Sequence, residues 1–327
     1  NVGAAMSAVS GDYKAKNSAI ELSLYQKVSM GSGYSANNPW LQEMPDPISR
    51  ACWDNYLAIP LAYANEHKLK LGDIVKLTAG KVSIEIPVLV QPGQTRGTVS
   101  LAVGYGREVV GKVGKGSFKT IAFGNQEWGG KNAFPFATLK NKIVQSENPS
   151  VKIEKTDKRM DIAQVQTHHT IMGRDIIQGS TLSKYKENRY AGRTFPKVTF
   201  KGKETKPYDM TLWKSNHKYP NHSWGLVVDL NACIGCGACM IACQAENNIP
   251  VVGKQEVLNR REMHWLRIDR YYTSSYILEE NQTPGISDYR KMEEAAENPE
   301  VVFQPMMCQH CNNAPCETVC PVLATTH

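Results

Sequence analysis

The stretch that decides the fold is Cys233-Ile-Gly-Cys236-Gly-Ala-Cys239-Met-Ile-Ala-Cys243, and a wider version follows as Cys308-Gln-His-Cys311-Asn-Asn-Ala-Pro-Cys316-Glu-Thr-Val-Cys320-Pro321. Together the two motifs contain eight of the nine cysteines of the chain. Two intervening residues let consecutive thiolates turn inward around one metal centre, and three such cysteines surround one corner of an iron–sulfur cluster. The spacing therefore predicts that all eight bind clusters: Cys233, Cys236, Cys239, Cys243, Cys308, Cys311, Cys316 and Cys320.

Zinc binding and disulfide formation are the alternative interpretations of these cysteines. A zinc site needs only four ligands, commonly as two separated pairs, and leaves the third and fourth cysteine of each motif unexplained. Disulfides between thiols of one helix would be redundant as cross-links. Clusters are therefore favoured. Because a cubane cluster exchanges one electron at a time, the motifs predict electron transfer, with no catalytic acid, base or nucleophile supplied by this chain.

Residues between the cysteines are candidates for tuning the clusters. Gly235 and Gly237 permit a tight backbone that approaches closely, and with Ala238 they are expected to present N–H groups to the first cluster. His310 lies between two cysteines of the second motif and is a candidate for tuning that cluster's potential. A turn histidine bonded to the backbone is the commoner role for such a residue.

Three other residues with reactive side chains are expected to be structural. Cys52 stands alone in the sequence, so a buried thiol is favoured over a ligand. His168 and His169 have no carboxylates at ligand spacing, so a loop position is favoured over a metal site.

Length and composition indicate a folded protein of two or three domains. The chain has 327 residues, 41% of them hydrophobic and 21% charged. Its net charge of +7 is spread through many lysines, which is typical of a solvated basic face, with an acidic partner or a membrane surface as the alternative. No apolar run approaches the roughly 20 residues needed to cross a bilayer. The lysine-rich region lacks regularly interleaved aromatic residues, so no nucleic acid partner is expected.

Patterning outside the motifs predicts short elements. A helix is expected over 54–70, with Pro60 in its first turn, and another over 238–246. The stretch 127–221 is mostly irregular, which suggests that it lies across a neighbouring domain or another polypeptide. Strands are predicted at 74–78, 82–90, 98–103, 151–154, 197–200, 224–230 and 264–272. The first three of these are expected to form a small antiparallel β unit.

With their flanking sequences, the motifs resemble a known family. The flanking sequences are Trp224-Gly-Leu-Val-Val-Asp229-Leu-Asn231, Gln244-Ala-Glu-Asn-Asn-Ile-Pro-Val, Arg261-Glu-Met-His-Trp-Leu-Arg-Ile-Asp269 and Phe303-Gln-Pro-Met-Met-Cys308. The chain is similar to four-cluster ferredoxin subunits of molybdopterin-type oxidoreductase complexes. More narrowly, it resembles the large iron–sulfur subunits of alternative complex III, a bacterial quinol oxidoreductase of the respiratory chain. The resemblance is specific over 224–327 and extends back to about Ser49.

Patterning and resemblance together imply an α+β fold in four parts. A peripheral wrapping segment is expected at 1–48, and a small β-barrel-like domain of the molybdopterin-oxidoreductase type, similar to a molybdopterin-dinucleotide-binding domain, at 49–125. An irregular connecting region follows at 126–222. A ferredoxin-like iron–sulfur domain is expected at 223–327, incomplete because the family has four cysteine motifs and this chain shows the first two.

The resemblance also implies cofactors, partners and location. At least two [4Fe-4S] clusters are expected, with a [3Fe-4S] cluster as an option at one site, and no molybdopterin. The implied partners are integral membrane quinol-binding subunits and c-type haem subunits. The chain itself would be peripheral to the membrane, on the periplasmic side of the bacterial inner membrane. Electrons would pass from quinol through the clusters to cytochrome c or a terminal oxidase.

Two groupings of the cysteines are open. In a closed two-cluster unit, Cys320 completes the first motif's cluster and Cys243 completes the second motif's. In the four-motif family, each of them instead completes a cluster whose other ligands lie beyond His327. The second grouping is favoured, because the gap of roughly 60 residues between the motifs is longer than a simple ferredoxin offers.

Two other functions compete with electron transfer. A molybdopterin-dependent reductase would need a bound pterin and a metal ligand, and only Cys52 is left outside the motifs for that role. A structural zinc protein that binds a partner through its basic surface would be colourless, whereas clusters absorb visible light.

Overall fold

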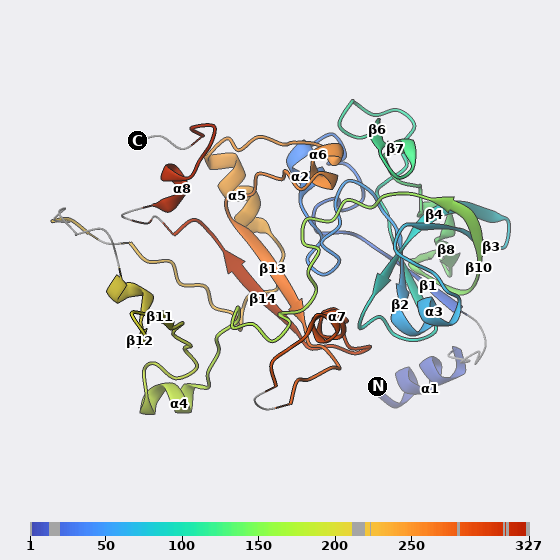
Figure 1. The fold of residues 1–327 in the computed structure, drawn as a ribbon. Coiled ribbons are helices and arrows are strands. Elements are labelled where there is room, and N and C mark those ends of the chain that lie inside the picture. Colours follow the sequence, from blue (N-terminus) through green and yellow to red (C-terminus); the bar gives the residue numbers. More distant parts are fainter. Residues whose placement is uncertain are drawn as a thin grey trace.

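A closed barrel of six strands, in the order β1-β10-β3-β4-β2-β5, forms one side of the molecule (Figure 1). The computed structural model describes residues 2–12, 20–210, 220–222, 224–279, 282–309, 311 and 314–324. The pairs β1–β5 and β2–β4 are parallel and the other four pairs are antiparallel. The barrel strands are β1 Ile20–Tyr25, β2 Leu57–Pro60, β3 Asp73–Ala79, β4 Val82–Gln91, β5 Thr98–Ala102 and β10 Glu147–Arg159.

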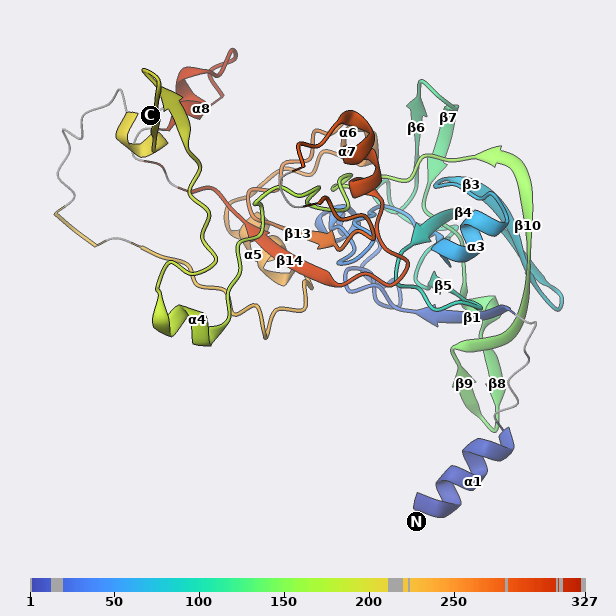
Figure 2. The same cartoon turned by 60° about the horizontal axis from the view of Figure 1, so that its bottom comes forward.

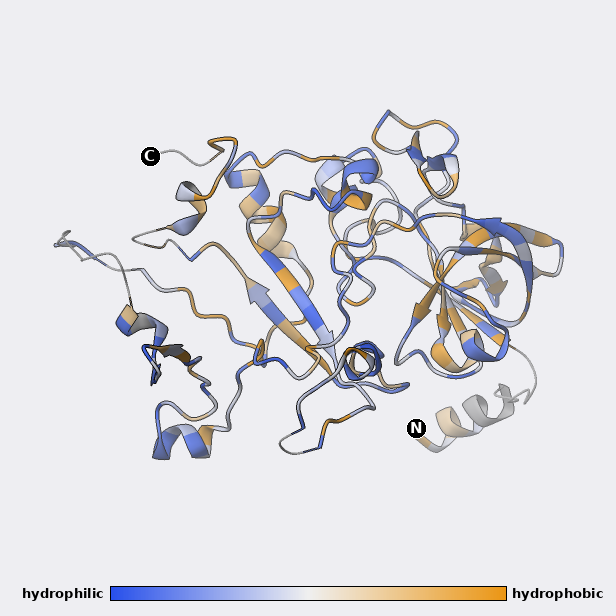
Figure 3. Ribbon diagram, viewed as in Figure 1, coloured by the Kyte–Doolittle hydropathy of each residue, from blue (hydrophilic) through white to orange (hydrophobic). Residues whose placement is uncertain are grey.

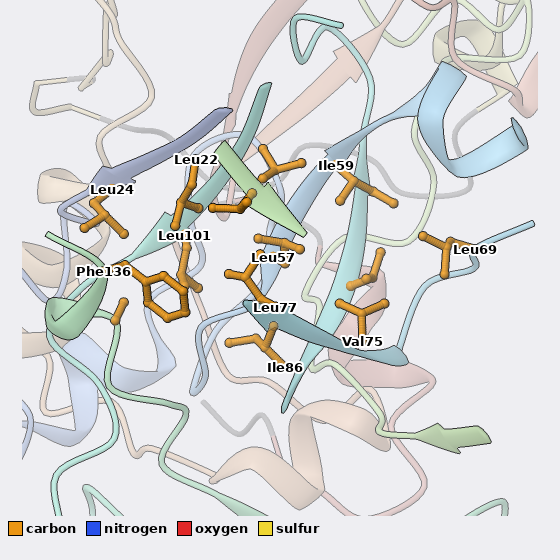
Figure 4. Close-up of a cluster of buried hydrophobic side chains, with 14 of the residues drawn as sticks. Leu22, Leu24, Leu57, Ile59, Leu69, Val75, Leu77, Ile86, Leu101 and Phe136 are labelled. Atoms are coloured by element: carbon orange, nitrogen blue, oxygen red, sulfur yellow. The ribbon is translucent and has the colours of Figure 1, made fainter. Parts of the chain in front are cut away.

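The barrel interior is the main hydrophobic core. Buried and more exposed residues alternate along β3, as expected of a strand with one face toward a core. Figure 3 shows the corresponding mixture of hydrophobic and hydrophilic residues along the barrel strands. Each fully buried aliphatic side chain contributes about 1.5–3 kcal/mol to folding. Five side chains from five different strands that are 0% exposed meet there: Leu22, Leu57, Leu77, Ile86 and Leu101 (Figure 4).

The predicted strands of the barrel are confirmed, but their arrangement differs from the prediction. The runs 74–78, 82–90 and 98–103 correspond to β3, β4 and β5, and 151–154 lies within β10. The expected antiparallel unit is instead closed by β1, which comes from the stretch predicted as a peripheral segment. Leu22 and Leu24 of β1 are buried in the core, which explains why this stretch joins the barrel. The four domain boundaries themselves stay predictions.

The helix predicted over 54–70 is only partly right. Residues 57–60 form β2, in which all four residues are buried and pair in parallel with β4. Burial on both faces favours a strand, and a proline at the end of that strand has no N–H to lose from the ladder. Pro60 then precedes α3 Leu61–Glu66 as its N-cap residue.

Three hairpins and several short helices lie outside the barrel. Helix α1 Val2–Asp12 and the β8–β9 hairpin extend away from the rest of the molecule (Figure 2). Over the residues that are described, no helix is both long and apolar enough to cross a membrane. The predicted strand at 197–200 is confirmed as β11. The remaining elements of this group are α2 Pro39–Glu43, α4 Leu182–Glu187, the 3₁₀ helices η1 Phe134–Phe136 and η2 Pro207–Met210, and the paired strands β6 Gly116–Thr120, β7 Gly124–Trp128, β8 Thr138–Lys140, β9 Ile143–Gln145, β11 Val198–Phe200 and β12 Lys203–Thr205.

The cysteine-rich part, residues 224–324, is built on an antiparallel strand pair. Strand β13 Arg267–Tyr272 pairs with β14 Val301–Met306, so that Arg267 lies opposite Met306 and Tyr272 opposite Val301. The helices here are α5 Ala238–Glu246, α6 Lys254–Leu258, α7 Ile286–Glu293 and α8 Pro315–Thr318. The helix predicted over 238–246 is confirmed, and the strand predicted over 264–272 is confirmed from Arg267 onward.

The strand predicted at 224–230 is wrong. No described residue pairs with this stretch, and the side chains of Trp224 and Val227 are 96% and 91% exposed. An apolar run alone does not make a strand, because a strand needs a neighbour to accept its backbone hydrogen bonds.

Segment 38–54 joins the barrel to the cysteine-rich part. Trp40 Nε1 donates a hydrogen bond to the carbonyl of Ile249 at 3.1 Å. The carboxylate of Glu43, which is 0% exposed, accepts bonds from the backbone N–H groups of Val252 at 3.1 Å and Gly253 at 2.8 Å. Burial raises the pKa of Glu43, and these two hydrogen bonds lower it. Helix α2 therefore fixes the loop that follows α5.

Candidate iron–sulfur site

The loop of the first motif depends on two glycines in left-handed conformations. Gly235 has φ +68° and Gly237 has φ +76°, values that side-chain-bearing residues rarely adopt. A Cβ atom at Gly235 would lie 2.4 Å from Cε1 of Phe303, and one at Gly237 would lie 2.5 Å from Cε of Met44. Glycine is therefore required at both positions by conformation and by space. The predicted close approach of this backbone is confirmed.

The thiol of Cys239 lies beside the other two cysteines of this loop. Burial raises the pKa of Cys239, hydrogen bonds from the backbone N–H groups of Met240 and Cys239 lower it, and the nearby Cys236 and Cys233 raise it. Cys239 stands in the first turn of α5, where backbone N–H groups have no partner within the helix and favour a negative charge. Three sulfur atoms thus gather at a place suited to thiolates.

Cys243 lies one helical turn beyond Cys239 on α5. Asn247 Nδ2 donates to the carbonyl of Cys243 at 2.9 Å and lies 3.6 Å from its sulfur. The next residue, Gln244, is buried, and its Nε2 is 3.3 Å from Nδ1 of His264. The fourth cysteine of the motif is therefore flanked by amide donors, which tune the charge on a thiolate.

The second motif follows directly from β14. Cys308, Cys311 and Cys316 are exposed, and Cys316 belongs to α8. The backbone N–H of Ala324 donates to the sulfur of Cys320 at 3.2 Å. His310, the candidate for tuning this cluster, lies outside the described residues, so its role stays a prediction.

The two motifs are connected through the strand pair. Phe303 of β14 places its ring against Gly235 in the first motif, and Cys308 of the second motif comes five residues later in the chain. Figure 1 shows α5 beside β13 and β14, with α8 beyond the end of β14. A shift of β14 would therefore move both cysteine motifs together.

The residues present fit an iron–sulfur cluster. Thiolate sulfur is the ligand type that such clusters use, and seven of the eight motif cysteines, all but Cys320, are free thiols in the part of the chain that the structure describes. The glycine loop gives space for a large group, and backbone N–H groups point toward sulfur. Among the described residues, no three His, Cys, Asp or Glu side chains converge to hold a single ion. The ligand sets and the grouping of Cys243 and Cys320 stay predictions.

A buried arginine beside the site was not foreseen from the sequence. Arg50 is 1% exposed and comes from the segment that joins the barrel to the cysteine-rich part. Burial lowers the pKa of His264 to about 4, and the charge of Arg50 lowers it further. His264 lies in one of the sequences that flank the motifs, but nothing in the sequence pairs it with a residue more than two hundred positions away.

The two adjacent histidines occupy a loop, as expected, but a carboxylate does lie close to them. Glu293 Oε1 of α7 is 3.6 Å from Nδ1 of His168 and accepts a bond from the backbone N–H of His169 at 2.9 Å. Sequence spacing could not show this contact, because Glu293 is far away in the chain. The expected burial of Cys52 is confirmed, since it is 3% exposed; burial raises the pKa of its thiol, and Glu43 raises it further.

Residues 232–324 match the 4Fe-4S dicluster domain, a stretch that contains all eight motif cysteines. The C-terminal part of this chain is a 4Fe-4S dicluster domain. This match supports [4Fe-4S] clusters as the cofactors and a ferredoxin-type fold for the part that binds them.

Similarity to curated proteins is confined to about the same third of the chain. Over 103 residues it is 35% identical to the menaquinone reductase iron–sulfur cluster-binding subunit of Nitratidesulfovibrio vulgaris, covering 31% of this chain and 32% of that protein. It is 28% identical over 106 residues to a tetrathionate reductase subunit of Salmonella typhimurium, covering 32% and 31%. It is 29% identical over 97 residues to the arsenate respiratory reductase iron–sulfur subunit ArrB of a Shewanella species, covering 30% and 29%.

The chain thus spans about a third of the length of each of these relatives. It is similar to iron–sulfur subunits of reductases, which supports electron transfer within an oxidoreductase as its general role.

Proposed function

We propose that this chain is the electron-transfer iron–sulfur subunit of a membrane-associated quinol oxidoreductase complex of the alternative complex III type. One observation supports this more than any other. A 4Fe-4S dicluster domain, with its two motifs connected by β13 and β14, is joined through buried contacts to a six-stranded barrel in the same chain. A barrel fused in front of a ferredoxin-type domain is the arrangement expected of that complex.

Similarity to a menaquinone reductase subunit supports the quinone side of the proposal. In this proposal the barrel is a relic of a molybdopterin-oxidoreductase-type domain without a cofactor. The partners are membrane quinol-binding subunits and c-type haem subunits on the periplasmic side of the bacterial inner membrane. Cytochrome c or a terminal oxidase then receives the electrons.

The work of the chain's own residues is to hold clusters and control their surroundings. Bound clusters supply one-electron exchange. The thiolates of the two motifs bind them, and the backbone N–H groups of Cys239 and Met240 place positive charge next to sulfur, which stabilises the more reduced state. Phe303 and Met44 pack on the glycine loop and keep water from that side of the first site.

Anaerobic reduction of the intact complex tests this function. Addition of a menaquinol analogue should bleach the cluster absorption before cytochrome c becomes reduced. A Cys239→Ser variant should lose or alter one centre and slow cytochrome c reduction. The matched control is Cys52→Ser, which changes a buried cysteine outside both motifs and should leave both signals intact.

Two results would contradict the proposal. Clusters that stay oxidised when quinol is added would remove the chain from the quinol pathway. Stoichiometric molybdenum in the purified chain would instead indicate a molybdopterin-dependent reductase.

A further inference from the structure

The positive charge of the chain is concentrated in one place, contrary to the sequence interpretation of a spread charge. Residues 182–206, here called the basic lobe, contain eight lysines and arginines and two glutamates. This excess of six charges accounts for nearly all of the net charge of +7. The lobe comprises α4, β11 and β12, and both ribbon views show it on the side of the cysteine-rich part that faces away from the barrel (Figure 1, Figure 2).

The basic lobe has no core of its own. Of its 25 residues, 23 are exposed, and none within this fully described stretch is buried. Leu182 is 69% exposed, and Tyr185, Tyr190 and Phe195 are each 54% exposed. Large apolar side chains gathered on a stretch that buries nothing mark a surface that is covered by something else.

Cations and aromatic rings are paired across the lobe. The guanidinium carbons of Arg189 and Arg193 each lie 5.9 Å from the centre of the Tyr190 ring, and Phe195 meets that ring edge-on at 6.2 Å. Lys201 Nζ lies 5.3 Å from the centre of the Phe200 ring. The positive charges therefore surround the apolar groups.

The base of the lobe is closed by local contacts. Gln178 and Thr194 exchange two hydrogen bonds, each 3.3 Å long. Gly192 has φ +76°, and a Cβ atom there would lie 2.2 Å from the carbonyl oxygen of Gly179. The lobe is thus presented as a closed loop and not as an extended linker.

We propose that the basic lobe docks on the surface of an anionic phospholipid bilayer. Tyrosine, phenylalanine and leucine side chains enter the boundary between headgroups and acyl chains, while lysine and arginine side chains reach the phosphates around them. Single-stranded nucleic acid fits less well. Tyr190 and Phe195 meet at 66°, and so do not offer the parallel faces on which successive bases stack. The docking uses no cysteine, so it stands or falls separately from the proposed electron transfer.

Co-sedimentation of the full-length, cluster-loaded chain with vesicles tests the proposal. The chain should bind phosphatidylcholine vesicles that contain phosphatidylglycerol, bind pure phosphatidylcholine weakly, and dissociate as salt is raised. A variant with Lys184→Ala, Arg189→Ala, Arg193→Ala and Lys201→Ala should bind at least about a hundredfold more weakly, since each basic residue near an anionic surface is worth roughly fivefold. Tyr190→Ala with Phe195→Ala should weaken binding at unchanged charge.

A charge-matched control removes four exposed lysines elsewhere, Lys70, Lys76, Lys81 and Lys112, and should bind like the unmodified chain. The cluster absorption of every variant should be unchanged, which shows that the chain still folds. Equal loss of binding in the control and the lobe variant would overturn the proposal. So would equal binding to both vesicle types, no effect of removing the aromatic residues, or tighter binding to a single-stranded oligonucleotide or an acidic protein than to the anionic vesicles.

Discussion

Lys254 and Asp54 form an ion pair between the cysteine-rich part and the segment that leads into the barrel, with side chains that are 0% and 3% exposed. Asp54 Oδ1 also accepts bonds from the backbone N–H groups of Gly129 at 2.8 Å and Gly130 at 3.0 Å. The Lys254 ammonium lies 4.1 Å from the centre of the Phe118 ring. Both charges are therefore satisfied only while the two parts of the molecule stay in contact.

Removal of either charge should destabilise the chain strongly. Asp54→Asn leaves the Lys254 ammonium buried without a counter-charge, and Lys254→Met leaves the carboxylate unpaired. Each should lower the free energy of unfolding by about 3–5 kcal/mol, as is typical when one partner of a buried pair is lost. Anaerobic urea unfolding followed by tryptophan fluorescence measures this change.

The exposed pair Arg96–Glu297 provides the matched control, because it also joins the barrel to the cysteine-rich part. Arg96→Ala should have little effect, since solvent screens exposed pairs. The double variant with Asp54→Asn and Lys254→Met should recover part of the loss, because no unpaired charge remains. Single variants as stable as the unmodified chain would show that the pair does not hold the two parts together.

Gly235→Ala should disturb the first cluster site more than its backbone strain alone explains. The added methyl group meets the Phe303 ring at 2.4 Å, and overpacking of this kind typically costs about 1–3 kcal/mol. Gly124→Ala is the control, because Gly124 has almost the same φ, +67°, and no atom within 4 Å of an added Cβ. Iron content and unfolding free energy should both fall further for Gly235→Ala. Equal effects of the two substitutions would mean that the contact with Phe303 is unimportant.

Stability should decrease as the pH falls below about 6.5. Burial lowers the pKa of His169 and of His264 to about 4, with Arg270 adding to the effect at His169 and Arg50 at His264. Between pH 6.5 and 4 the unfolded chain binds protons at these positions while the folded chain does not, so protonation favours unfolding. Each histidine should contribute up to about 1.4 kcal/mol per pH unit in this window and no slope above or below it.

Thermal unfolding between pH 7.5 and 5 measures the slope. His169→Gln keeps a polar side chain that does not titrate, and should make the unfolding temperature less dependent on pH than in the unmodified chain. An unchanged slope in this variant would show that His169 is protonated equally in the folded and unfolded states.

Local patterns predicted the elements well but not the closure of the barrel. Alternating β-branched residues gave β3, β4 and β5, and the apolar run after Gly237 gave α5 with the bounds that the structure shows. The closing strands β1 and β10 come from stretches of weak pattern, and their places depend on pairing with distant strands. The apolar run 224–230 fails for the same reason, since no described strand pairs with it.

The candidate site was predictable where spacing determines it and hidden where distant residues supply it. Cysteine intervals and two glycines are visible in the sequence. The contacts of Glu43 with Gly253, of Asp54 with Lys254 and of Arg50 with His264 join positions about two hundred residues apart. No local pattern relates such residues, because three-dimensional packing alone brings them together.

The central claim is that the eight motif cysteines hold iron–sulfur clusters that transfer electrons. The most direct measurement is the iron and acid-labile sulfide content of anaerobically purified chain, combined with its absorption before and after dithionite. We expect both elements in stoichiometric amounts and broad absorption that bleaches on reduction, reduced in Cys239→Ser and unchanged in Cys52→Ser. A colourless protein without iron or sulfide, or with zinc in their place, would contradict the claim.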